Sequence, residues 1–264
     1  MIIDFHTHIF PDKLAAHAVS SLAAAVHIPP CTDGTLACTE KLMQSAGVTQ
    51  FAALNIATSP RSEKNVNDFA IAVNGRHVAF GSVHPDSENA LSELDRLWKN
   101  GVKGVKFHNE YQNFFVDDEK AFPLYEKIEK LGLTAVFHGG YDPAYEPPCK
   151  CPPERAAHIL SAFPKAKFVF AHLGGLGMAD ETLKYLKNTA AFIDTACMAG
   201  GFDERTAEKI VKEFGAERVL FGSDCPWEHP ATTLAFLKKL RLGEAELELI
   251  LYKNAAKLLG LNDR

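Results

Sequence analysis

Histidines occur where apolar segments end, and the first pair lies at the start of the chain. The sequence begins Met-Ile-Ile-Asp-Phe-His-Thr-His, so an apolar run of strand type over residues 1–5 leads into His6 and His8. Because side chains alternate between the faces of a strand, these two histidines should point the same way, about 6–7 Å apart along the chain, with Asp4 on that face too. Two neighbouring imidazoles could supply half of a divalent metal site, the alternative being a pair of surface histidines.

Chemistry-bearing side chains recur where further predicted strands end. They are Lys106 and His108 at the end of a strand at 102–107, His138 after 133–137, His172 after 167–171, and Asp224 after 218–222. Neutral imidazoles and one carboxylate, with a coordination position left open for water, suit zinc or another borderline divalent ion. Such an ion lowers the pKa of its bound water towards about 7 and polarises a carbonyl group. A further histidine or carboxylate in contact with that water can take its proton.

The elements that would position these side chains alternate between strand and helix. Strands are predicted to begin near residues 1, 48, 77, 102, 133, 167, 191 and 218, with helical segments between them. Repeats of about 24 to 35 residues, after a longer first unit, fit βα units that close into a parallel barrel. The strands are nearly continuous apolar runs, as in sheets covered on both faces. We therefore predict an α/β fold, a (β/α)8 TIM barrel formed as a single domain over residues 1–264, whose strand ends share one rim.

An open doubly wound sheet is the competing fold for this alternation. It would require a glycine-rich phosphate turn after the first strand, where this chain has two histidines instead. After the last strand, residues 231–259 are predicted to be helical.

Composition and charge exclude several classes of function. The net charge is −5, from 28 basic and 33 acidic residues, and no basic stripe indicates nucleic-acid binding. No apolar run approaches the length of a membrane span, and the N-terminus lacks the basic region of a signal peptide. We therefore expect a cytoplasmic protein with no nucleic-acid or membrane partner. Its six cysteines are expected to be free thiols, and the spacing of Cys149 and Cys151 matches no standard zinc pattern.

The combined pattern resembles a known family. The motifs that carry the resemblance are Asp4-x-His6-x-His8, His138, His172 and Gly222-Ser223-Asp224-x-Pro226-Trp227, together with Asn-Ala-Ala-Lys-Leu-Leu at 254–259. They resemble the amidohydrolase superfamily, and within it the amidohydrolase 2 branch, which includes aminocarboxymuconate-semialdehyde decarboxylase and related decarboxylases and lactonases. The resemblance spans nearly the whole chain. The combination is specific, although each motif alone is not.

This resemblance implies a metal centre and its ligands. One divalent metal ion, zinc or alternatively manganese, would be held by His6, His8, His138 and Asp224. His172 would orient or deprotonate the metal-bound water, and Asp224 could also shuttle a proton. Asp4 is expected to support the site rather than to bind the ion.

The role of Lys106 has two alternatives. In two-metal relatives the end of the fourth strand carries a carboxylated lysine that bridges the ions. In the mononuclear branch that this chain resembles, Lys106 and His108 would instead bind substrate, and we favour this reading. Tyr111 and Trp227 lie near the rim and are further candidates for substrate binding.

Three hypotheses for the function follow. The first is a metal-dependent hydrolase, in which an activated water attacks the carbonyl of a lactone, ester or amide in a small carboxylated compound. The second is a metal-dependent non-oxidative decarboxylase on the same scaffold. The third is a metal-containing binding protein without catalysis, which would need neither His172 nor Asp224. The short loops suit a small substrate or a pocket completed by another subunit, so a homodimer is an open alternative.

Overall fold

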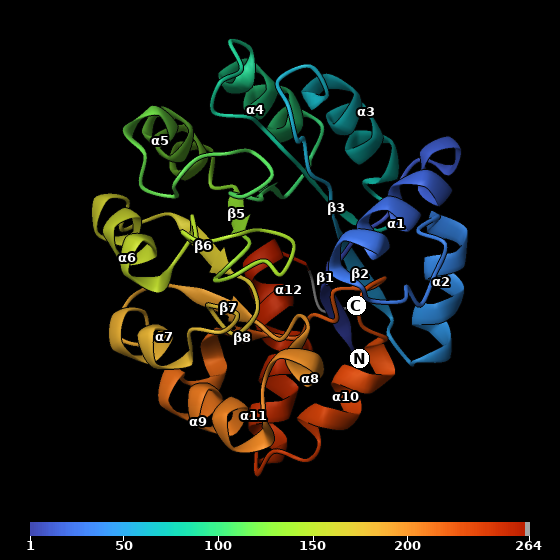
Figure 1. Cartoon of the computed structure of the whole chain (residues 1–264), viewed down its shortest axis with the longest axis vertical. Helices are drawn as coiled ribbons and strands as arrows, with labels where there is room; N and C mark the ends of the chain where they lie inside the picture. The colour runs from blue at the N-terminus through green and yellow to red at the C-terminus, as the bar shows by residue number, and fades with distance from the viewer. Residues whose placement is uncertain (262–264) are drawn as a thin grey trace.

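Eight parallel strands form one sheet in chain order in the computed structural model, which describes residues 1–261 (Figure 1). The strands are β1 (Ile3–Thr7), β2 (Gln50–Leu54), β3 (Val78–Gly81), β4 (Gly104–Phe107), β5 (Thr134–Phe137), β6 (Lys167–Phe170), β7 (Phe192–Asp194) and β8 (Val219–Leu220). The first and last strands meet, because the backbone nitrogen of Phe5 donates to Phe221 O at 2.7 Å and that of Asp224 donates to His6 O at 2.8 Å. The predicted α/β TIM barrel is confirmed. The last three residues of the predicted domain 1–264 lie outside the described residues.

Helices follow the strands and surround the barrel. They are α1 (Asp12–Val26), α2 (Leu36–Ser45), α3 (Glu63–Val73), α4 (Ala90–Lys99), α5 (Phe122–Leu131), α6 (Pro153–Ala162), α7 (Ala179–Tyr185), α8 (Met198–Gly201), α9 (Glu204–Phe214), α10 (Pro230–Leu237), α11 (Glu244–Glu248) and α12 (Asn254–Leu259), with a π-helical turn at Leu249–Lys253. No helix within residues 1–261 is both long and apolar enough to cross a bilayer.

The C-terminal segment is not the continuous helix predicted over residues 231–259. The helix α10 ends at Leu237, and α11 begins only after Gly243. Gly243 donates its backbone N–H to the Glu246 carboxylate at 2.6 Å, a capping contact that starts a new helix. The prediction of one continuous helix is therefore wrong across residues 238–243.

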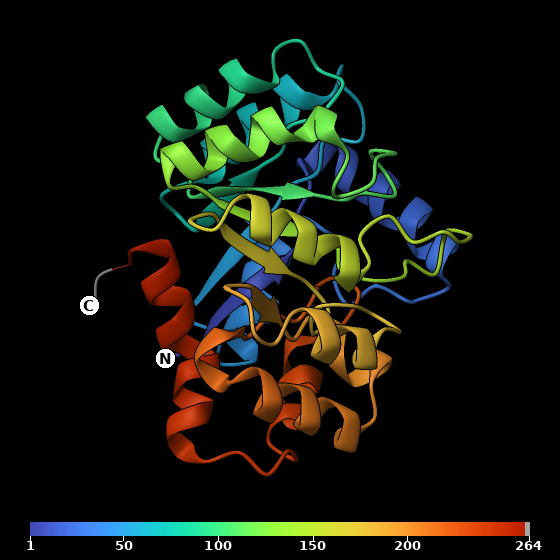
Figure 2. The same cartoon turned by 90° about the vertical axis from the view of Figure 1, so that its left-hand side faces the viewer.

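Two apolar layers leave only one end of the barrel free for a site. Inward-facing side chains such as Phe5 and Phe80 pack in one cluster with Ala255 and Leu259 of α12. This helix lies on the side of the barrel opposite the projecting α1 and loop 141–153, as Figure 2 shows. Outward-facing side chains such as Phe137 pack in the layer beneath the surrounding helices. Helix α12 therefore fills one end of the barrel, and the rim formed by the carboxyl ends of the strands is open.

Strand β1 is irregular where it carries the histidines. Its register with β2 shifts after Asp4. Phe5 packs inside the barrel, and the next residue, His6, also faces inward, which is the mark of a β-bulge. The predicted common face of Asp4 with His6 and His8 is therefore wrong for Asp4. Its carboxylate turns to the backbone instead, and Oδ1 accepts from Ser223 N at 3.0 Å.

Candidate active site

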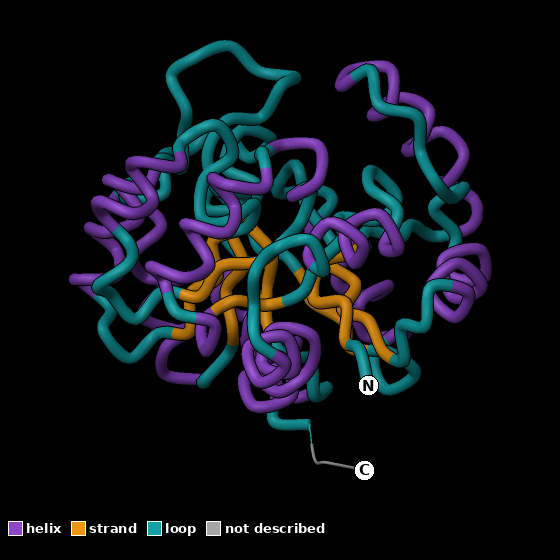
Figure 3. Tube along the Cα trace, turned by 90° about the horizontal axis from the view of Figure 1, so that it is seen from below, coloured by secondary structure: helices purple, strands orange, loops and turns teal. Residues whose placement is uncertain are grey.

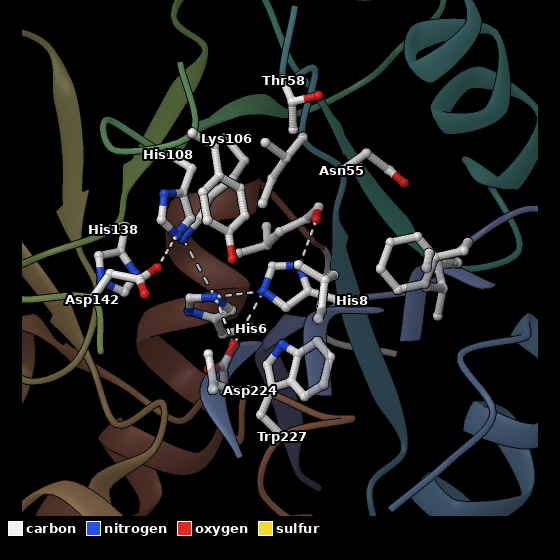
Figure 4. Close-up of a pocket in the computed structure, with 18 of the residues that line it drawn as sticks. His6, His8, Asn55, Thr58, Lys106, His108, His138, Asp142, Asp224 and Trp227 are labelled. Atoms are coloured by element: carbon white, nitrogen blue, oxygen red, sulfur yellow. Dashed lines mark hydrogen bonds and ion pairs between the residues drawn. The ribbon is translucent and has the colours of Figure 1, made fainter. Parts of the chain in front are cut away.

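The two histidines of β1 and the aspartate that follows β8 converge at the rim (Figure 4). His6 Nε2 lies 3.3 Å from His8 Nε2, and Asp224 Oδ1 lies 3.2 Å and 3.1 Å from these two nitrogens. His6 and Asp224 are buried, and the His8 side chain is 12% exposed. Three ligand-type atoms therefore meet across the seam between the first and last strands.

In His6 and His8, the partner of Nδ1 determines whether Nε2 carries a proton or a lone pair. Nδ1 of His6 lies 2.8 Å from Asp194 Oδ2, and Nδ1 of His8 lies 2.9 Å from Leu54 O. Carbonyl and carboxylate oxygens only accept, so a neutral ring carries its proton on Nδ1 and a lone pair on Nε2. Burial, together with the nearby Lys106, lowers the pKa of His6 to about 4, so this ring is neutral at pH 7.

Three electron pairs therefore face one another at this point, and the arrangement fits a divalent cation. Asp224 Oδ1 is buried, with no hydrogen-bond partner among residues 1–261. Although burial opposes its ionisation, the contacts with His6 and His8 hold the pKa of Asp224 well below its usual range. Its backbone has a φ of 71°, an uncommon left-handed conformation that concentrates at functional sites. Two imidazole nitrogens and one carboxylate are typical ligands of catalytic zinc and similar ions.

His138 and His172 form a second close pair beside this centre. His172 Nδ1 lies 3.0 Å from Ala196 O, and His138 Nε2 lies 3.3 Å from Tyr141 O. Their other nitrogens, His172 Nε2 and His138 Nδ1, lie 3.0 Å apart. Both outer nitrogens face carbonyl oxygens, so in neutral rings these nitrogens carry the protons. The short contact between His172 Nε2 and His138 Nδ1 then has no proton. The pair can therefore accept a proton or pass one between its members.

Three of the four predicted metal ligands lie together, and the fourth, His138, lies in a neighbouring group. Ligand atoms within 4.8 Å of one another form three groups in the described part of the chain: His6–His8–Asp224, His108–His138–Asp142 and His172–Cys197–Asp224. His138 thus lies in the neighbouring group, with its Nδ1 directed at His172. Its role as a fourth ligand remains a prediction. Asp142 and Cys197 also lie at the site.

The predicted substrate-binding groups flank the centre. Lys106 is 1% exposed, and its Nζ lies 3.4 Å from His6 Nε2. Burial lowers the pKa of Lys106 to about 8. His108 Nε2 lies 3.2 Å from Asp142 Oδ2, and the Tyr111 ring stacks on His108 with centroids 3.6 Å apart. The structure brings all three predicted residues to the site, and both alternatives for Lys106 remain open.

These groups form one end of a cavity of about 880 Å³, within the size range of small-molecule sites. Tyr111 and Trp227 line this cavity, so the fourth predicted substrate-binding residue also lies at the site. A long loop and a long helix project from the same side of the barrel (Figure 3). Figure 2 identifies them by colour as loop 141–153 and α1.

Comparison with known proteins assigns the chain to a family. Residues 3–261 match the amidohydrolase 2 family model, described as Amidohydrolase. The chain belongs to the amidohydrolase 2 family. This membership confirms the predicted resemblance to a family of metal-dependent enzymes.

Relatives of this amidohydrolase with stated activities include decarboxylases. The 2-amino-3-carboxymuconate-6-semialdehyde decarboxylase of Dictyostelium discoideum is 25% identical over 224 residues, which are 71% of this chain and 62% of that protein. This chain thus matches less than two thirds of that relative's length. A solved 2,6-dihydroxybenzoate decarboxylase in complex with 2,6-dihydroxybenzoate has a TM-score of 0.75 at 17% identity, covering 98% of this chain and 99% of its own. A dihydroxybenzoic acid decarboxylase from a Polaromonas species, with bound manganese and the inhibitor 2-nitroresorcinol, has a TM-score of 0.72 at 16% identity, covering 100% and 98%. At such identities the solved structures establish the fold alone.

Asp194, which ends β7, organises the candidate metal site of this amidohydrolase, although the sequence patterns did not single it out. Its Oδ1 accepts from the backbone nitrogens of His172 and Ala196, each at 3.0 Å, while Oδ2 accepts from His6. Although burial opposes its ionisation, the contact with His6 lowers the pKa of Asp194 to about 2. A buried carboxylate of this kind fixes the tautomer of a ligating histidine. The available signal was a carboxylate at the end of a predicted strand, as for Asp224.

Close packing at the seam sets the position of His6. A Cβ atom on Gly222, which follows β8, would lie 2.7 Å from His6 Cβ. A glycine inside or beside a strand often marks such a close approach. The glycine of the predicted Gly222-Ser223-Asp224 motif thus makes room for His6, the first of the predicted metal ligands.

Proposed function

We propose that this amidohydrolase is a metal-dependent non-oxidative decarboxylase of a small carboxylated compound. The observation that carries the proposal is the convergence of His6 Nε2, His8 Nε2 and Asp224 Oδ1 at the floor of the cavity. The activities stated for the relatives above support decarboxylation over hydrolysis, the reaction that the sequence patterns placed first. Zinc is the proposed ion. Manganese is the alternative, supported by the manganese-bound Polaromonas decarboxylase.

His6, His8 and Asp224, with His138 as the proposed fourth ligand, would hold an ion that draws negative charge from a substrate oxygen. Lys106 places a second positive charge beside His6, where it can bind a carboxylate oxygen. Its pKa of about 8 leaves most of the amine protonated at pH 7. Substrate binding here therefore depends on a negatively charged head group.

Decarboxylation needs a proton donor as well as a charge-binding site. When the carbon–carbon bond breaks, its electron pair stays on the substrate carbon, and a proton must replace the departing carbon dioxide. His172 is the proposed donor, since its Nδ1 is committed to Ala196 O and its Nε2 is free to carry a proton.

The reaction class is tested by incubating the metal-loaded protein with aromatic and muconate-type carboxylates, and with lactones for comparison. We expect at least one carboxylate to release carbon dioxide and to give a product lighter by that group. In deuterated water the product should carry one deuterium on the carbon that lost the carboxylate. Lactone opening without release of carbon dioxide would instead establish the hydrolase hypothesis. Bound metal with neither reaction would favour the binding protein.

Replacing His172 with asparagine tests the proton donor. The amide can still donate to Ala196 O, but it cannot carry a mobile proton, so kcat should fall about 10²–10⁴-fold while the metal content stays the same. Steady-state kinetics and elemental analysis measure the two quantities. The matched control is His158→Asn on α6, whose side chain is 64% exposed and pairs with Asp117. An unchanged rate in His172→Asn would remove this residue from the mechanism.

A further inference from the structure

The cavity continues well beyond the metal centre. Its lining joins the histidines and Asp224 to side chains from α1 and α3, which are aliphatic or aromatic except for Asn65. Its volume of about 880 Å³ lies in the upper part of the range of about 300–1,000 Å³ for small-molecule pockets. A small carboxylated head group bound at the metal centre would therefore leave the apolar end filled only with water.

Helix α1 supplies one wall of this apolar end. Leu14, Ala18, Leu22 and Val26 recur every fourth residue, so they form one stripe along the helix, and all four line the cavity. The stripe extends about 18 Å along the helix axis. Leu14, at one end of the stripe, is 58% exposed, and the other three are half-buried. The stripe is thus turned to the cavity rather than packed into the core.

Helix α3 supplies a second part of this lining, through Val66 and Phe69. Both side chains are half-buried, as are Phe10 and Ile56, which also line the cavity. Among the lining residues, no charged side chain comes from α1 or α3. The charged residues of the lining lie around the metal centre and in the loops above it. The cavity is therefore divided into a polar end and an apolar groove.

We propose that this groove, lined by Leu14, Ala18, Leu22, Val26, Val66 and Phe69, binds an apolar arm of the substrate. The arm is an aliphatic chain or an aryl group joined to the carboxylated head. The groove and the metal centre are parts of one cavity, so a single molecule can fill both. The occupant of the groove is therefore part of the substrate. The inference rests on the proposed function, which places the head group at the metal centre.

The groove is tested with straight-chain hydroxamates, a metal-binding head on an alkyl arm of increasing length. Calorimetric titration of the metal-loaded protein with butano-, hexano-, octano- and decanohydroxamate gives Kd for each. We expect Kd to fall about three- to fourfold for each added methylene that enters the groove. The heat-capacity change of binding should become more negative along the series.

Two substitutions on α1 locate the arm. Ala18→Phe fills the groove, so affinity should stop rising with chain length while binding of butanohydroxamate stays nearly unchanged. Ala16→Phe is the matched control, because it places the same side chain at an exposed position on the opposite face of the helix. This control should retain the chain-length dependence of the wild type. The assignment would be overturned if affinity stopped rising with chain length in both variants, or in neither.

Removing the metal separates this inference from the proposed function. Metal-free protein should bind every hydroxamate more weakly by a similar factor, while the dependence on chain length persists. Affinity that is independent of metal but rises with chain length would support the groove and contradict the metal centre. Metal-dependent affinity with no chain-length dependence would overturn the groove. If Leu14→Glu also dissociated a dimer in sedimentation experiments, the stripe would belong to a contact between two copies of the chain.

Discussion

The double variant His6→Ala/His8→Ala is expected to contain almost no divalent metal, against about one ion per chain in the wild type. Both inward-facing nitrogen lone pairs are removed, so Asp224 is the only member left of the group that converges across the barrel seam. Decarboxylation should fall at least about 10³-fold, since a metal ion contributes several kcal/mol of stabilisation to the developing charge. Elemental analysis after gel filtration and kcat at saturating substrate measure the two losses.

The control for this variant replaces two exposed histidines, His17 and His158, with alanine. It should keep its metal and its rate. Circular dichroism checks that both double variants are folded. Full metal content in His6→Ala/His8→Ala would contradict the proposed centre. Two ions per chain in the wild type, with a carboxylated Lys106, would establish the two-metal alternative for that lysine.

Asp194→Asn is expected to weaken metal binding about 10- to 100-fold, the usual cost of losing a group that orients a ligand. The amide oxygen can still accept from the backbone nitrogens of His172 and Ala196, which places the amide nitrogen against His6 Nδ1. An amide nitrogen only donates, so His6 must move its proton to Nε2, where it points at the metal position. Competition with a chromophoric chelator measures the affinity, and excess metal should restore part of the rate.

Two further variants separate this tautomer effect from a loss of stability. Asp180→Asn changes a side chain on α7 that is 94% exposed, and it should bind metal like the wild type. Asp194→Ala leaves the buried N–H groups of His172 and Ala196 without an acceptor, at a cost of about 1–3 kcal/mol each, so its Tm should fall well below that of Asp194→Asn. Wild-type metal affinity in Asp194→Asn would contradict the assigned tautomer.

The barrel and much of its rim could be predicted because both follow from periodicity. Apolar strand runs alternate with helices, and polar side chains such as His172 and Asp224 stand where those runs end. The β-bulge in β1 could not be predicted, because one extra residue in a strand has no signature in a run as short as Ile-Ile-Asp-Phe. The helix break before Gly243 was missed because apolar residues continue through it.

The remaining site residues escaped prediction for other physical reasons. Asp142 and Cys197 lie in irregular segments, where no period relates a residue to its direction. The His138–His172 contact depends on how two neighbouring strand ends lean towards each other, which spacing along the chain does not encode. Asp194 ends a predicted strand as a carboxylate, as Asp224 does, so the sequence carried a signal for it.

The seam of the barrel also constrains when the metal centre can form. His6 and His8 precede Asp224 in the chain, so they are synthesised before it. An incomplete chain therefore offers the ion two imidazoles without their carboxylate. An ion that binds only the folded barrel would stabilise the pairing of β1 with β8. The stabilisation would rise with the logarithm of the metal concentration. Metal supply would then influence how long the newly made chain stays folded, as well as how fast it turns over substrate.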